Sequence, residues 1–76
     1  MNRERRKQIQ KVIEKIESMQ SEIEVIRDDE QDYLDNIPEN LQGSERYENS
    51  EAAIENLDSA IDGIEELINN LSESAV

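Results

Sequence analysis

Apolar residues recur at alternating steps of three and four along most of the chain, a pattern typical of helices that pack side by side. One series of such positions fills the first half of the chain and a second series fills the other half. The first series is Ile9, Val12, Ile16, Met19, Ile23, Ile26, Glu30, Tyr33 and Ile37, and the second is Tyr47, Ser50, Ile54, Leu57, Ile61, Ile64, Ile68, Leu71 and Ala75. The pattern predicts two amphipathic helices, over about residues 3–35 and 45–72.

A turn over about residues 36–44 separates the two helices and contains the only proline of the chain, Pro38. Proline disfavours helical backbone at the residue before it, so the first helix is expected to end here. Asn36 and Glu39 have capping-box spacing and could start a short helical turn, which Gly43 could end in a left-handed conformation. Ser44 is placed to cap the second helix.

The two helices are expected to pair antiparallel, in a register where facing residue numbers sum to about 80. This register places Glu30 and Ser50, the polar interruptions of the two series, in one layer, whereas a slip of one heptad would bury Glu30 against Leu57. The predicted fold is therefore all-α: one coiled-coil-like helical hairpin that forms a single domain over residues 1–76.

Two helices cover only one side of each other, so apolar residues beside the seams are expected to face water in a lone hairpin. Self-association into a four-helix bundle would cover them, and a higher cyclic or dihedral oligomer is the alternative. The residues predicted at the contact between subunits are Ile13, Leu34, Ala53, Ala60 and Leu67.

Composition narrows the classes of function. The chain has 76 residues and no His or Cys, so the usual nucleophile, proton shuttle and soft-metal ligands are missing and we expect neither an enzyme nor a cofactor. The acidic residues 28–32 lack the glycine and distal glutamate of a calcium-binding loop, so no metal site is expected. No apolar run approaches the ~18 residues of a membrane span, and the N-terminus lacks the apolar core of a signal peptide, so the expected location is the cytoplasm.

The net charge of −12 is unevenly distributed, because residues 1–27 sum to +2 and residues 28–76 to −14. Four cations lie at the start of the first helix, where the helix dipole disfavours positive charge: Arg3, Arg5, Arg6 and Lys7. One interpretation is ion pairing across the hairpin, with Lys7 near Glu73 and Lys15 near Glu65 and Glu66. The other is binding of an anion, such as a nucleotide phosphate or an acidic protein segment.

A second candidate site lies at the turn, where Tyr33, Arg46 and Tyr47 would offer two aromatic faces and a guanidinium near Glu30, Gln42 and Ser44. Such a set can stack on a planar ligand and form hydrogen bonds with it. The alternative is structural: the tyrosines close the end of the core, and Arg46 neutralises Glu30.

The acidic residues of the second helix suggest a third use. Regularly spaced carboxylates along a helix can imitate nucleic acid and occupy the basic groove of an enzyme, although most acidic faces only keep a protein in solution. The residues concerned are Glu51, Glu55, Asp58, Asp62, Glu65 and Glu66. Direct DNA binding is not expected, because the remaining surface would repel phosphates.

Residues 35–48, DNIPENLQGSERYE, and 52–62, AAIENLDSAID, resemble a group of small acidic helical proteins encoded by bacteriophages and prophages. This resemblance implies an accessory protein that acts inside a bacterial cell and interferes with host machinery without catalysis. The leading hypothesis is an oligomeric hairpin that sequesters a small anionic ligand, such as a nucleotide signal of host immunity. The alternatives are an acidic inhibitor of a basic host nucleic-acid-binding protein and a purely structural protein that assembles with itself.

Overall fold

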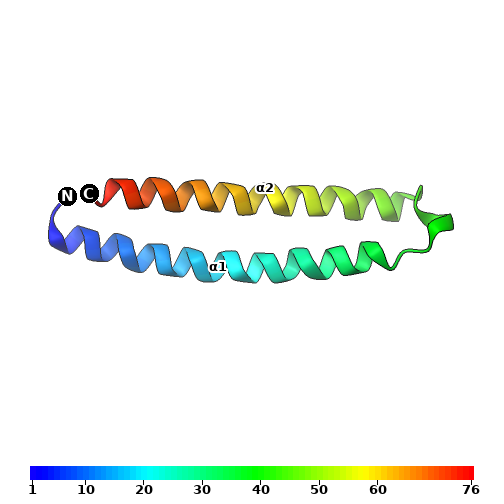
Figure 1. The fold of residues 1–76 in the computed structure, drawn as a ribbon, viewed down its shortest axis with the longest axis horizontal. Helices are drawn as coiled ribbons and strands as arrows, with labels where there is room; N and C mark the ends of the chain where they lie inside the picture. The colour runs from blue at the N-terminus through cyan, green and yellow to red at the C-terminus, as the bar shows by residue number, and fades with distance from the viewer.

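The computed structural model describes residues 1–76 as two long antiparallel helices that form a thin rod (Figure 1). Helix α1 spans Arg3–Asp35, a short 3₁₀ helix η1 spans Glu39–Leu41, and α2 spans Glu45–Ser74. The rod measures 59 × 15 × 12 Å, and both termini lie at the end opposite the turn. The predicted all-α hairpin is confirmed. Neither helix has a stretch long and apolar enough to cross a lipid bilayer.

Polar side chains cap the N-terminus of each helix. The Asn2 side chain accepts a hydrogen bond from the Arg5 backbone N–H at 2.8 Å, and the Ser44 hydroxyl accepts one from the Tyr47 backbone N–H at 3.3 Å. Each bond satisfies one of the backbone donors that a helix start leaves free. The cap predicted at Ser44 is confirmed.

The turn between the helices differs in detail from the prediction. The Asn36 side chain donates to the Asp32 carbonyl at 2.7 Å, so it caps the end of α1 and does not start η1, which has no side-chain cap. Gly43 does not adopt a left-handed conformation. A backbone hydrogen bond from Ser44 to the Leu41 carbonyl, at 3.1 Å, closes the turn with ordinary dihedral angles, so no special glycine geometry is needed there.

The register of the hairpin is the predicted one at its polar layer. Ser50 is only 4% exposed, and its hydroxyl donates to the Glu30 carboxylate across the helix interface at 2.8 Å. The hydrogen bond satisfies both polar groups, so a layer that would be costly without a partner is retained inside the seam.

The buried side of α1 is rotated relative to the predicted seam. Ile13 is 6% exposed and Val12 is 45% exposed, so the isoleucine faces α2 and the neighbouring valine faces outward. The same shift recurs each heptad: the positions predicted in the seam but found exposed are Val12, Met19, Ile26 and Tyr33, and those that replace them are Ile13, Gln20, Arg27 and Leu34. The expectation that Ile13 faces water beside the seam is therefore wrong, whereas Leu34 is only partly buried and its place at a subunit contact stays a prediction.

Two polar residues can enter this seam because α2 offers partners to each. The Arg27 Nε donates to the Asp58 carboxylate at 2.9 Å, and the Gln20 amide donates to the Glu65 carboxylate at 3.5 Å. The hydrogen bond to Asp58 raises the pKa of the Arg27 guanidinium above its usual value. Long side chains can cover the seam with their stems and keep their polar heads at its edge.

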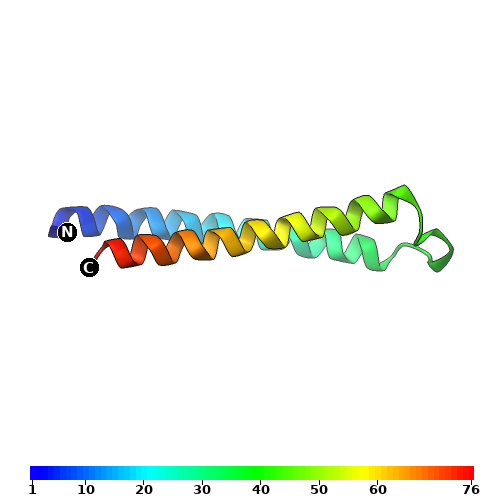
Figure 2. The same ribbon diagram turned by 90° about the horizontal axis from the view of Figure 1, so that it is seen from above.

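The core formed in this way is thin. Only five of the 76 residues are buried, four of them isoleucines, and no large side chain is completely enclosed. Viewed from above, the two helices cross each other along the rod (Figure 2). No third element covers either helix. A single pair of helices therefore buries one strip of each helix and leaves the adjacent strips in water.

Neighbouring residues of α1 offer a direct test of this rotation. We expect Ile13→Ala to lower the free energy of unfolding by about 2–4 kcal/mol, because it removes buried methyl groups from the seam. Val12→Ala is expected to change it by less than about 0.5 kcal/mol in the dilute chain, because the side chain is already half exposed. Urea unfolding followed by circular dichroism measures both, and the opposite ranking would restore the predicted seam.

Candidate functional site

Four of the five large apolar side chains exposed on α1 form one line along the helix, and the fifth, Val25, is 61% exposed and lies outside it. Val12, Met19, Ile26 and Tyr33 are spaced by seven, a step that returns to nearly the same side of an α-helix. Their exposed fractions lie between 42% and 56%, high for large apolar side chains that recur so regularly. We call these four residues the α1 row.

A matching line runs along α2, again with a spacing of seven, and we call it the α2 row. It contains Arg46, Ala53, Ala60 and Leu67. Ala60 and Leu67 are exposed, as predicted, and Ala53 is partly exposed. After Arg46, none of the positions at this spacing carries a charge up to the end of α2, although 37% of the residues in the chain are charged.

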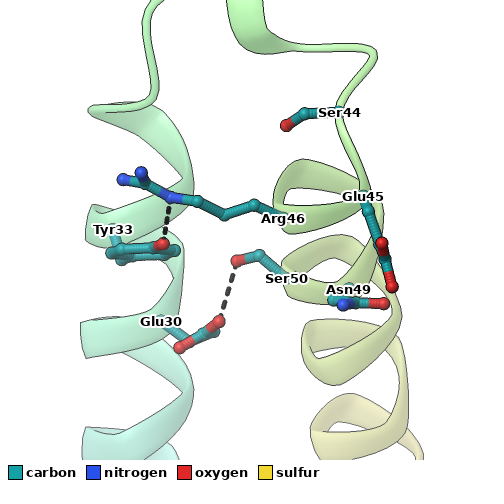
Figure 3. A pocket seen from close by; sticks show the side chains of 7 residues that line it. All are labelled: Glu30, Tyr33, Ser44, Glu45, Arg46, Asn49 and Ser50. Carbon is teal, nitrogen blue, oxygen red and sulfur yellow. Dashed lines mark hydrogen bonds between the residues drawn. The ribbon is translucent and has the colours of Figure 1, made fainter.

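Arg46 and Tyr33 show that the two rows lie on the same face of the hairpin. The Arg46 Nε donates a hydrogen bond to the Tyr33 hydroxyl, and the guanidinium carbon lies 5.1 Å from the centre of the tyrosine ring (Figure 3). The last member of the α1 row thus contacts the first member of the α2 row. Because each row keeps to one side of its helix, the rows form a continuous strip, which we call the open face.

An open depression of about 780 Å³ lies at the turn end of this face. It is lined by Glu30, Tyr33, Ser44, Glu45, Arg46, Asn49 and Ser50 (Figure 3). The structure therefore brings Tyr33 and Arg46 together, as the sequence predicts. Tyr47 and Gln42 do not line the depression, since Tyr47 belongs to the seam with α1.

The charges of this depression do not favour an anion. Glu30 and Glu45 contribute two carboxylates, and Arg46 contributes the only cation. Arg46 forms no ion pair with Glu30, contrary to the structural alternative, because it is turned toward Tyr33 while Glu30 accepts from Ser50. The site can stack on a planar group, but its net charge is negative.

The predicted N-terminal cluster lies at the far end of the rod and is unpaired within the chain. Arg27 forms both ion pairs of the hairpin, so the pairs predicted for Lys7 and Lys15 are absent and Glu65 is engaged by Gln20 instead. A smaller depression of about 280 Å³ opens beside Arg5, lined mostly by apolar side chains. Arg3, Arg5, Arg6 and Lys7 are all exposed.

The two candidate sites cannot act together within one chain. The N-terminal cluster and the Tyr33–Arg46 pair lie at opposite ends of a rod 59 Å long. No group of three or more acidic side chains is arranged to hold a metal ion. The open face runs between the two sites, and the sequence predicted only its α2 half, because the α1 row was assigned to the seam.

No protein-family model, curated protein or solved structure matches this chain. The resemblance to phage proteins therefore stays a prediction.

The Arg46–Tyr33 contact predicts an optical change. We expect Arg46→Gln to alter the near-ultraviolet circular dichroism of the tyrosines and to destabilise the hairpin by about 0.5–1 kcal/mol, since a cation over an exposed ring contributes about that much. Tyr47→Phe serves as a control, because it removes the other tyrosine signal and leaves that of Tyr33. An unchanged Tyr33 signal in the Arg46 variant would contradict the contact.

Proposed function

We propose that this protein is a non-catalytic helix-pairing module whose open face binds another helical surface. The α1 row carries the proposal: it leaves Met19 51% and Ile26 56% exposed in a regular line. Scattered exposed apolar residues are ordinary, but a contiguous apolar strip is typical of protein interfaces.

The arrangement of the open face supports a helix as the partner. Apolar side chains at heptad spacing on α1 lie beside small side chains on α2, so the face offers projecting residues next to shallow positions. Helices dock on such surfaces by inserting side chains into the gaps between those of the partner. A small rigid substrate would need an enclosed pocket, whereas both depressions here are open.

Polar substitution of the α1 row tests this function. We expect the Met19→Gln, Ile26→Gln double variant to keep the helical content of the hairpin, because neither residue is buried, and to lose association through the open face. A photoreactive amino acid placed at Met19 in the full chain should form a cross-linked adduct with the molecule bound to the open face. Adding Ile26→Gln to the same chain should abolish this adduct. Absence of any adduct at Met19 would overturn the proposal.

The matched control for this experiment is the same photoreactive residue at Glu17. Two helical steps rotate Glu17 by about 200° from Met19, so it lies on the other side of α1, and it is also exposed. An adduct of equal yield at Glu17 would indicate random collisions and not a defined binding face.

Binding of a small anion is the second candidate function, and the unpaired N-terminal cluster favours it. Four cations that form no ion pair in the hairpin, close to one helix end, can coordinate phosphate oxygens. For this candidate we expect the anion to bind at Arg5 and its neighbours and not at Arg46, where two carboxylates line the depression.

Calorimetry with cyclic nucleotides and ADP-ribose derivatives tests the second candidate. If the N-terminal cluster binds the anion, Arg5→Ala should weaken binding at least several-fold, and Arg46→Ala should leave the affinity unchanged because its surroundings are acidic. No heat with any nucleotide, or equal heat from the wild type and Arg5→Ala, would eliminate this candidate.

A further inference from the structure

The open face has a symmetry that identifies its occupant. Cross-helix hydrogen bonds join Arg27 to Asp58 and Gln20 to Glu65, so Ala60 is level with a point on α1 between these two contacts. Interpolation between the two contacts places Ala60 level with Val25, about 4 Å along the helix from the midpoint of the α1 row between Met19 and Ile26. The α1 row and the three uncharged members of the α2 row, Ala53, Ala60 and Leu67, are therefore centred at nearly the same height along the rod.

We propose, resting on the helix-pairing function above, that a second copy of this chain covers the open face in antiparallel orientation. A two-fold axis across the rod at the height of Ala60 would bring Met19 of one copy beside Ile26 of the other. The same axis sets Val12 beside Tyr33. Every member of the α1 row thus meets an apolar residue, which is the self-complementary pattern of a two-fold interface.

The α2 row fits the same axis. Ala60 would meet Ala60 of the second copy, and Ala53 would meet Leu67. Small residues at the centre let two helices approach closely, and the larger leucine falls opposite a small residue at each end. One symmetry operation thus satisfies both rows, which closes two hairpins into a four-helix bundle.

Charge selects the antiparallel orientation. Residues 28–58, the turn half of the rod, sum to −10, and the rest of the chain sums to −2. Parallel hairpins would place two strongly acidic halves side by side, while antiparallel hairpins place each acidic half along the half that carries the N-terminal cations. The cations that have no partner within the chain would then lie beside the acidic turn of the second copy.

The rod is large enough to carry the interface of a specific dimer. Its side measures 59 by 15 Å, a flat area of roughly 900 Å², which has room for the ~800 Å² that each partner buries in a standard interface.

Single-cysteine variants test the orientation, because the chain has no cysteine of its own. Under mild oxidation we expect Ala60→Cys to form a disulfide-linked dimer with itself. Ala53→Cys and Leu67→Cys are each expected to stay unlinked alone and to link to each other when mixed. Ser59→Cys, one residue from Ala60 and exposed outside both rows, is the matched control and should remain unlinked.

Sedimentation equilibrium and spin labels complete the test. The full-length chain should have twice its monomer mass of 8.8 kDa, and labels at Asn40→Cys on the two turns should be separated by a distance near the 59 Å rod length. Turns close together, or Ala60→Cys linking to Met19→Cys and not to itself, would overturn the antiparallel orientation. A monomer in sedimentation would overturn the dimer, and an adduct between Met19 and a different protein would then leave the helix-pairing function standing.

Discussion

The structure depends on one imbalance: α1 carries more apolar surface than a single helix can cover. The isoleucines at the middle of its stripe, Ile9, Ile16 and Ile23, are flanked on one side by the residues that face α2 and on the other by the α1 row. In its first heptad α1 has three such apolar positions, Ile9, Val12 and Ile13, and in the next two heptads the third position is polar. An apolar stripe wider than a pair of helices requires is typical of a helix that contacts two neighbours in a bundle. The hairpin supplies only one of those neighbours.

The polar contacts decide which flank faces α2. The hydrogen bond between Ser50 and Glu30 sets the register. Arg27, which is paired with Asp58, occupies a position in the seam that the adjacent Ile26 could have filled. A polar residue at this edge keeps its hydrogen bonds, so its cost is small, and the apolar row remains available on the other flank. Polar layers of this kind specify one arrangement among several that hydrophobicity alone would permit.

The sequence predicted the helices and register well, because periodicity, the proline and the Ser44 cap are local signals. It assigned Val12 to the seam in place of Ile13, because adjacent apolar residues in a broad stripe satisfy the same period and only the partner helix distinguishes them. Pairing of Tyr33 with Arg46 could be predicted from the register. The ion pairs expected for Lys7 and Lys15 could not be judged from charge pattern alone, since exposed lysines gain little from fixing one rotamer.

The rotation of α1 that leaves the α1 row exposed also explains why the chain combines a high net charge with an uncharged strip. Negative charge on the turn half keeps copies apart in most orientations, since any approach that aligns two such halves brings together ten net charges from each. An approach that covers the open face is favourable only when the acidic half of one copy meets the cationic end of the other. In the proposed dimer, charge would set the orientation and the two rows would provide the contact area, and neither feature could fulfil both roles alone.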